Sequence, residues 1–244
     1  MPTNLRPIVA RWNGWCPICE QNTVFEANDA WYRDSLVCSK CEGGSIPRDR
    51  ALMQVIRELV PHWANLAIHE SSPEPRGASV VLARDCGHYT ASQYFPGIEI
   101  GTIHQGFRCE NLERQTFADE AFDLVVSQDV MEHVFHPELA YREVWRTLKR
   151  GGLYIHTTPI YKDRVSTLCR ATISDGKVTH LAEPEYHGNP IDPNGSLVTF
   201  HYGYDLADKI AQWTPFEVEI RRFNQRHLGI VAEFTEVIIC KKLL

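Results

Sequence analysis

The segment that decides the fold runs from Phe122 to Pro159 and reads FDLVVSQDVMEHVFHPELAYREVWRTLKRGGLYIHTTP. Residues 121–127 form a near-continuous apolar run, which is typical of a strand buried on both faces. Residues 137–149 begin with proline and carry apolar side chains at helical spacing, so they predict an amphipathic helix ended by glycines 151–152. Residues 153–158 predict a further strand. A strand, a helix and a strand in this order favour a parallel sheet.

The same alternation continues outward from this segment in both directions. Upstream, the pattern predicts helices at 48–59 and 77–86, and strands at 65–69, 89–92 and 107–109. Downstream, it predicts a helix at 204–213 and an edge pair of antiparallel strands at 216–222 and 236–241. The sequence therefore predicts an α/β fold with a doubly wound, mostly parallel sheet.

The segment from Phe122 to Pro159 also resembles the region between the fourth and fifth strands of class I S-adenosylmethionine-dependent methyltransferases. The matching pieces are Phe122-Asp123-Leu124, Glu132-His133, Arg142-Glu143, the turn at 148–152 and Thr158-Pro159. The resemblance extends more loosely over residues 62–158. It implies a Rossmann-like sheet of seven strands, S-adenosylmethionine as cofactor, and a binding site across the carboxyl ends of the strands.

The resemblance also implies which residues hold the cofactor. They follow the first four strands of the sheet: Glu70, Ser71 and Ser72 after the first, Gln93 after the second, Glu110 and Asn111 after the third, and Gln128 and Asp129 after the fourth. In this assignment Glu70 meets the methionyl ammonium, Gln93 the ribose hydroxyls and Glu110 the adenine amino group. Gln128 and Asp129 line the methionine end.

Two of these positions depart from the family pattern. The glycine-rich loop after the first strand is replaced by HESSPEPRG, residues 69–77, in which glycine returns only at Gly77. The acid that grips the ribose is replaced by Ser92-Gln93, and an amide binds hydroxyls without charge assistance. These departures motivate an alternative, in which the domain is a binding module without catalysis.

Histidines supply the candidate bases for methyl transfer to an oxygen or nitrogen. His133 follows the fourth strand, and His187 lies in a long polar insertion at about residues 160–204, which we expect to cover the acceptor. We expect His187 to act as the base ahead of His133. Alternatively, histidines of the insertion bind a second metal ion together with Glu185, although their spacing matches no tight template.

Four cysteines near the N-terminus predict a metal site. Cys16, Cys19, Cys38 and Cys41 form two CxxC pairs separated by eighteen residues, a spacing that suits tetrahedral zinc. Four thiolates close the coordination sphere, so we expect a structural zinc. The sequence thus predicts a zinc-ribbon unit at residues 1–45, followed by the methyltransferase domain at 46–244.

Composition narrows the class of acceptor. The 244 residues carry a net charge of −6, which disfavours nucleic acid, and we expect a small-molecule or sugar-containing acceptor. An RNA methyltransferase whose zinc ribbon binds RNA is the alternative within the same enzyme class. The sequence shows no signal peptide and no long apolar run, so we expect a cytoplasmic protein without membrane contact.

Overall fold

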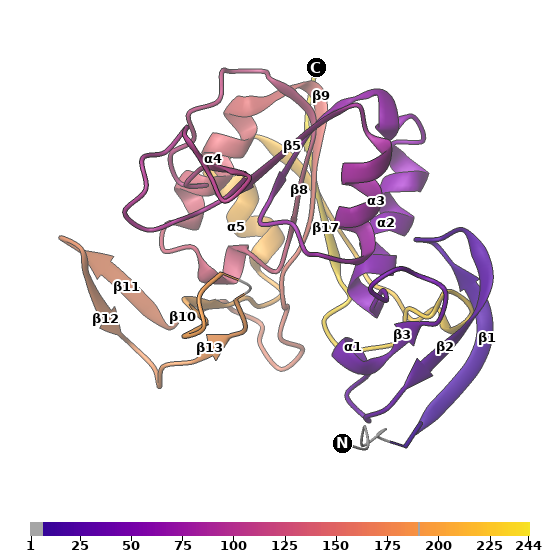
Figure 1. The fold of residues 1–244 in the computed structure, drawn as a ribbon. Helices are drawn as coiled ribbons and strands as arrows, with labels where there is room; N and C mark the ends of the chain where they lie inside the picture. Colours follow the sequence, from indigo (N-terminus) through magenta and orange to yellow (C-terminus); the bar gives the residue numbers. More distant parts are fainter. Residues whose placement is uncertain (1–6, 190) are drawn as a thin grey trace.

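One eight-stranded sheet forms the centre of the molecule (Figure 1). This computed structural model describes residues 7–189 and 191–244. The strand order is β16-β17-β9-β8-β4-β5-β7-β6. Their bounds are β4 (Ala67–Ser71), β5 (His88–Gln93), β6 (Ile103–His104), β7 (Phe107–Cys109), β8 (Phe122–Gln128), β9 (Leu148–Thr157), β16 (Phe216–Arg221) and β17 (Val237–Lys242).

The predicted fold class is confirmed, with one addition. The five strands from β9 to β7 run parallel, and β16 and β17 form the expected antiparallel pair at one edge. The eighth strand is the short β6, which pairs antiparallel with β7 at the other edge. The predicted end of the helix before β9 was wrong: the helix stops at Thr147, and Gly151, with φ of +78°, lies within β9.

Helices cover both faces of this sheet (Figure 1). The helices α2 (Pro47–Leu59) and α3 (Gly77–Asp85) lie on one face, and α4 (Pro137–Thr147) and α5 (Leu206–Trp213) lie on the other. Leu124 and Val126 of β8 pack into a first core, which lies between the sheet and helices α2 and α3. Val125 packs into a second core, which lies between the sheet and helices α4 and α5. The apolar run of β8 is therefore buried on both faces, as the sequence predicts.

The N-terminal unit is a small antiparallel sheet that shares the first core. It comprises β1 (Ala10–Cys16), β2 (Gln21–Ala27), α1 (Tyr32–Ser35) and β3 (Val37–Cys38). Phe25 and Leu36 belong to the same buried cluster as the apolar face of α2. The fully buried Arg50 of α2 donates hydrogen bonds to the carbonyls of Leu36, Ser45 and Gly229. The unit is thus packed onto the sheet domain, and a domain boundary near residue 45 stays a prediction.

The insertion between β9 and α5 contains short strand pairs. They are β10 (Leu168–Cys169), β11 (Ala171–Ser174), β12 (Lys177–His180), β13 (Tyr186–His187), β14 (Ser196–Leu197) and β15 (Phe200–His201). Single 3-10 turns lie at η1 (Trp63–Asn65), η2 (Met131–His133) and η3 (Arg226–Leu228). Thr199 and Tyr202 donate hydrogen bonds to the carbonyls of Glu132 and Met131, which fastens the insertion to the turn after β8.

Among the described residues, no helix combines the length and the apolar character that crossing a bilayer requires.

Candidate functional site

The predicted cofactor residues meet at one edge of the sheet. Ser71 of β4 lies level with Ser92 of β5 and Ser127 of β8, and Gln128 lies level with Thr157 of β9. Gln93 is level with Cys109, so Glu110 follows at the same edge. Parallel strands thus bring residues from four separate positions in the chain to their common carboxyl edge, where ligands of open α/β sheets bind.

The loop after β4 is tight although it lacks the usual glycines. Ser72 has a φ of +56°, a conformation that is uncommon for a residue with a side chain. Gly77 begins α3 with a φ of +59°, and a Cβ there would collide with the carboxylate of Asp49. Glu74, in the same loop, forms an ion pair of 3.0 Å with Arg48 of α2. The backbone of the loop is therefore held close to the strand edge by α2.

The side chain of Glu70 lies under this loop and contacts protein groups. Its buried carboxylate accepts hydrogen bonds from Ser79 Oγ at 2.5 Å and from the Tyr89 hydroxyl at 2.7 Å. Burial raises the pKa of Glu70 to about 7. Both partners lie on the elements flanking β4, so Glu70 joins α3 to β5 in this structure.

Glu110 and Asn111 also make local contacts. The Glu110 carboxylate accepts hydrogen bonds from Arg108 Nε at 2.7 Å and from the backbone and hydroxyl of Thr116. The Asn111 side-chain oxygen accepts a hydrogen bond from the Glu113 amide at 2.9 Å. Both side chains therefore shape the loop after β7.

Two amides at the edge retain capacity for a ligand. The Gln128 side chain donates to Ser79 Oγ at 3.1 Å, but its buried Oε1 has no hydrogen-bond partner among the described residues. The Gln93 side-chain amide makes no hydrogen bond within the described part of the chain, but unlike Gln128 Oε1 its polar atoms are not fully buried. A buried polar atom without a partner is costly. A polar cofactor bound at the carboxyl edge of the sheet would form hydrogen bonds with these two amides.

Asp129 connects the edge to the N-terminal unit. Its carboxylate forms ion pairs with Arg33 of α1 and, at 2.5 Å, with Arg48 of α2. Thr157 of β9 donates a further hydrogen bond of 2.8 Å. Burial acts to raise the pKa of Asp129, but the charges of Arg48 and Arg33 outweigh burial and lower it well below its usual value.

The two candidate bases lie side by side. The rings of His133 and His187 are perpendicular, with centroids 5.2 Å apart, although the two residues are 54 positions apart in the chain. His133 Nδ1 lies 2.9 Å from the Leu197 carbonyl, which fixes the ring. Burial lowers the pKa of His133 to about 4, so the imidazole is neutral at pH 7. The insertion thus brings His187 to the end of β8.

Glu132 completes this cluster, and the sequence analysis gave it no role. It is 1% exposed, and its Oε2 accepts a hydrogen bond of 2.9 Å from Thr158. Its Oε1 lies 3.9 Å from His133 Nε2 and 3.9 Å from His187 Nδ1, and it has no hydrogen-bond partner among the described residues. Burial and the nearby charge of Asp129 raise the pKa of Glu132 to about 8. The signal in the sequence that could have identified Glu132 was its position next to His133 in the matching Glu132-His133 pair.

Further polar and aromatic side chains of the insertion surround the cluster. Glu185 lies 3.3 Å from His187 Nε2 and 2.8 Å from His201 Nε2, and it pairs with Arg170 at 3.2 Å. Tyr161 stacks on His201 with ring centroids 4.0 Å apart. Phe234, from the segment before β17, contacts both Tyr161 and Trp31. The insertion, the C-terminal segment and the N-terminal unit therefore all meet beside this cluster.

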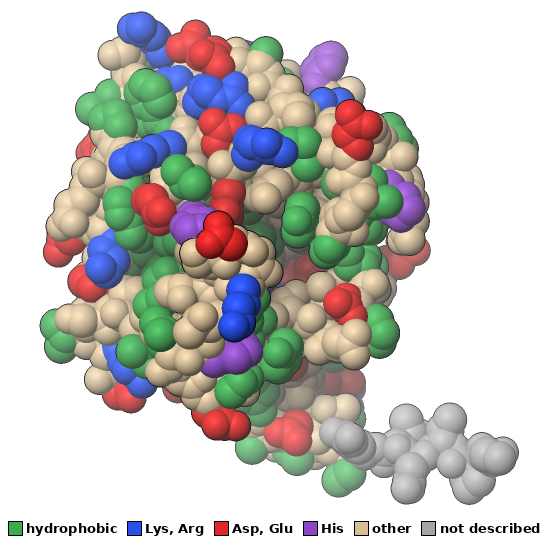
Figure 2. All heavy atoms as spheres, turned by 90° about the vertical axis from the view of Figure 1, so that its left-hand side faces the viewer, with side chains coloured by type: hydrophobic (Ala, Val, Ile, Leu, Met, Phe, Trp, Pro, Cys, Tyr) green, Lys and Arg blue, Asp and Glu red, His purple; other side chains and the backbone are tan. Residues whose placement is uncertain are grey.

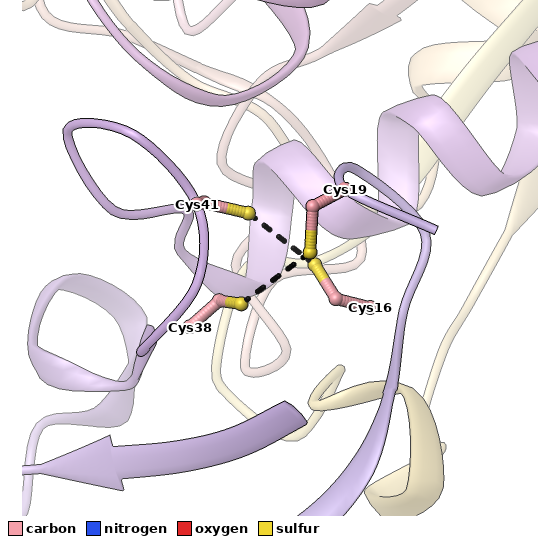
Figure 3. A group of neighbouring side chains, drawn as sticks. All are labelled: Cys16, Cys19, Cys38 and Cys41. Carbon is pink, nitrogen blue, oxygen red and sulfur yellow. Dashed lines mark hydrogen bonds between the residues drawn. The ribbon is translucent and has the colours of Figure 1, made fainter. Parts of the chain in front are cut away.

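The four cysteines converge as the spacing predicts (Figure 3). Their sulfurs all lie within 4.8 Å of one another. The Cys16–Cys41 and Cys19–Cys38 sulfur separations are 3.5 and 3.9 Å. Zinc at about 2.3 Å from each sulfur of a tetrahedral site places sulfurs about 3.8 Å apart. The geometry of the cysteine cluster therefore fits one zinc ion.

Comparisons with known proteins point to one enzyme class. Residues 82–156 match the family model described as "Methyltransferase domain". None of the curated proteins compared with the chain matches it.

Solved structures resemble this chain in fold. An S-adenosylmethionine-dependent methyltransferase from Mesorhizobium loti is 13% identical with a TM-score of 0.50, over 78% of this chain and 97% of that one. The 1,6-didemethyltoxoflavin-N1-methyltransferase of Burkholderia thailandensis is 12% identical with a TM-score of 0.47, over 80% of each chain. At these identities the likeness concerns the fold alone.

Proposed function

We propose that this protein, a class I S-adenosylmethionine-dependent methyltransferase, transfers the methyl group to an oxygen of a small polar acceptor that binds beneath the insertion. The observation that carries the proposal is the Glu132, His133 and His187 cluster. It lies just past the carboxyl end of β8, beside the expected cofactor edge, and the insertion covers it. A hydroxyl acceptor requires a group that removes its proton, and this cluster is placed to provide one.

The carboxyl edge supplies the groups that would hold the cofactor. S-adenosylmethionine brings an already activated methyl group on its sulfonium, so the protein mainly has to bind and align. We assign Gln93 to the ribose hydroxyls and the free Oε1 of Gln128 to the methionine end. Ser71 and Ser72 approach through the backbone of their tight loop. Glu70 supports this loop from below through its bond to Ser79.

Within the cluster, His187 is better placed than His133 to contact an acceptor. Its side chain is 34% exposed, whereas that of His133 is 18% exposed. Glu185 accepts a hydrogen bond from His187 Nε2, which leaves Nδ1 with its lone pair toward Glu132. An imidazole oriented by a carboxylate is the arrangement that serves acid–base steps in other enzymes. This supports the ranking of His187 ahead of His133.

The surface favours a small acceptor over RNA. Figure 2 shows acidic and basic side chains interspersed over the face that it presents, without a continuous basic patch. The net charge of −6 also opposes a polyanionic partner. RNA binding draws mainly on clustered Lys and Arg side chains. We therefore place the acceptor among hydroxylated small molecules, including sugar-containing ones.

An acceptor screen tests this proposal. The purified protein is incubated with S-adenosylmethionine and a panel of hydroxylated small molecules, with total RNA in parallel, and release of S-adenosylhomocysteine is measured. We expect turnover with a small molecule, loss of turnover in His187→Ala, and retention in the matched variant His180→Ala, whose histidine is exposed in the same insertion. Turnover with RNA alone would overturn the assignment of the acceptor.

We also propose that the four cysteines bind a structural zinc ion. Four thiolates leave no open position for a substrate, so the ion would stabilise the N-terminal unit instead of reacting. Because this unit carries Arg33, which pairs with Asp129, zinc would also fix one wall of the candidate site. Zinc would therefore support the site from a distance.

A further inference from the structure

We propose that Glu132, His133 and His187 bind a divalent transition-metal ion with open coordination positions, and that this ion binds the acceptor oxygen. The three side chains present donor atoms within 4.8 Å of one another. This ion is distinct from the zinc proposed for the four cysteines. The role toward the acceptor rests on the proposed function, whereas the binding of the ion does not.

Hydrogen bonds orient both imidazoles so that one nitrogen of each is free for a metal ion. A carbonyl oxygen only accepts hydrogen bonds, so His133 donates from Nδ1 to Leu197 and its Nε2 carries the lone pair. Glu185 likewise accepts a hydrogen bond from His187 Nε2–H, which leaves the lone pair of His187 on Nδ1. These two free nitrogens are the ones that face Glu132 Oε1. Metal-binding histidines are oriented in this way by a carbonyl or carboxylate on the other nitrogen.

The carboxyl group of Glu132 is buried and lacks a partner on one oxygen among the described residues. It is 1% exposed, and its Oε1 faces both imidazoles without accepting a hydrogen bond from any described residue. No Lys or Arg in the described chain lies within ion-pair distance of it, because the nearby Arg33 is engaged by Asp129. A buried carboxyl group becomes ionised at neutral pH only when a positive charge accompanies it. A cation between Glu132 and the two imidazoles would provide it.

The distances fit an ion after a small adjustment. Ligand atoms about 2.1 Å from a tetrahedral ion lie about 3.4 Å apart, and the observed separations from Glu132 Oε1 are 3.9 Å. Two imidazoles and one carboxylate suit zinc, iron, cobalt or manganese better than magnesium or calcium. Three protein ligands leave positions open for oxygen ligands, as in catalytic metal sites.

With the ion bound, the imidazole lone pairs are occupied, so the two histidines would act by positioning the ion. Coordination of the acceptor hydroxyl lowers its pKa, and its O–H bond breaks with release of the proton to solvent. The oxygen then forms a bond to the methyl carbon while the sulfur–methyl bond breaks and its electron pair returns to sulfur. The positive charge of the sulfonium is thereby lost.

Cobalt titration of the zinc-loaded protein tests the binding of the ion. Visible absorption distinguishes the two sites, because cobalt bound by nitrogen and oxygen lacks the thiolate charge-transfer bands of a four-cysteine site. We expect one nitrogen- and oxygen-bound cobalt per chain. His187→Ala should abolish it, and Glu185→Gln should weaken it about 10- to 100-fold because Glu185 orients His187. His180→Ala should bind cobalt as the wild type does.

Two results would overturn the inference: a wild-type titration without nitrogen- and oxygen-bound cobalt, or unchanged binding in His187→Ala. His187 lies in the short strand β13 and its side chain is 34% exposed, and circular dichroism shows whether the variant remains folded. Binding of S-adenosylhomocysteine is measured on the same samples. Cofactor binding without cobalt binding contradicts the metal site alone, whereas cobalt binding without cofactor binding contradicts the proposed function alone.

Discussion

Arg33 lies between the two cysteine pairs and forms an ion pair with Asp129, which directly follows strand β8. The two residues are 96 positions apart in the chain. The contact joins the cysteine-bearing unit to the edge of the sheet where the cofactor is expected. Because Arg48 of α2 binds the same carboxylate, three segments of the chain are held together at one carboxylate that is only 12% exposed.

Replacement of Asp129 by asparagine should destabilise the protein strongly. The change leaves two buried arginines without their shared counter-ion, and removal of one partner from a buried ion pair costs about 3–5 kcal/mol. Asp119→Asn is the matched control, because Asp119 is exposed and its pair with Arg146 is worth at most about 1 kcal/mol. Urea denaturation measures both free energies of unfolding. Equal losses of unfolding free energy in the two variants would contradict a larger contribution from the Asp129 ion pairs.

Stability should fall with rising pH because of Glu70. Its pKa is raised from 4.5 to about 7 on folding, so its contribution is fully present below pH 4.5 and is lost as the pH rises through 7. A shift of this size corresponds to about 3 kcal/mol. Glu70→Gln should therefore gain about 3 kcal/mol relative to the wild type between pH 4.5 and pH 8. Glu217→Gln, at an exposed position, serves as control. A difference in unfolding free energy between Glu70→Gln and the wild type that does not change with pH would contradict the raised pKa of Glu70.

Loss of the proposed zinc should unfold more than the N-terminal unit. Cys16, Phe25 and Leu36 share one core with α2, so Cys38→Ser should release one zinc per chain and lower the Tm of the whole protein. Cys169→Ser, which changes a cysteine outside the cluster, should leave zinc content unchanged. Zinc analysis and thermal melting measure both effects. A zinc-free Cys38→Ser protein that melts at the wild-type temperature would refute the structural role.

Truncation of His187 should remove activity while sparing cofactor affinity. Loss of a general base, or of a ligand that positions a metal ion, typically lowers kcat by about 10²–10⁴. Since the histidine lies in the insertion and not at the Gln93 and Gln128 edge, binding of S-adenosylhomocysteine should not change. Product release and calorimetry give the two readouts. Parallel loss of both would indicate that His187 supports the fold of the site.

Periodic features of the sequence were sufficient to predict the α/β fold class. The run at residues 121–127 and the helical spacing after Pro137 act locally, so strand β8 and helix α4 follow from them directly. The cysteine spacing likewise predicted a cluster, because CxxC geometry is local. The pairing of β8 with β9 shifts register across the segment that contains Gly151, and this irregularity was missed, since a glycine with positive φ serves a helix end and a bulged strand equally well.

The contacts of the site depend on long-range packing and were not readable in advance. Nothing in the sequence around Arg33 indicates that its guanidinium reaches Asp129. The proximity of His187 to Glu132 depends on how the insertion attaches through Thr199. Glu110 matches a family motif, yet its carboxylate is engaged by Arg108 and Thr116. The motifs thus predicted which residues lie at the sheet edge. Their hydrogen-bond partners became known only from the three-dimensional structure.

Calorimetric titration of the zinc-loaded protein with S-adenosylhomocysteine tests the central claim most directly. We expect one binding site per chain. Gln128→Ala should weaken binding about tenfold, because it removes one hydrogen bond of about 1–1.5 kcal/mol in a buried site. An absence of binding heat at high-micromolar ligand, with the protein shown to be folded, would contradict the account.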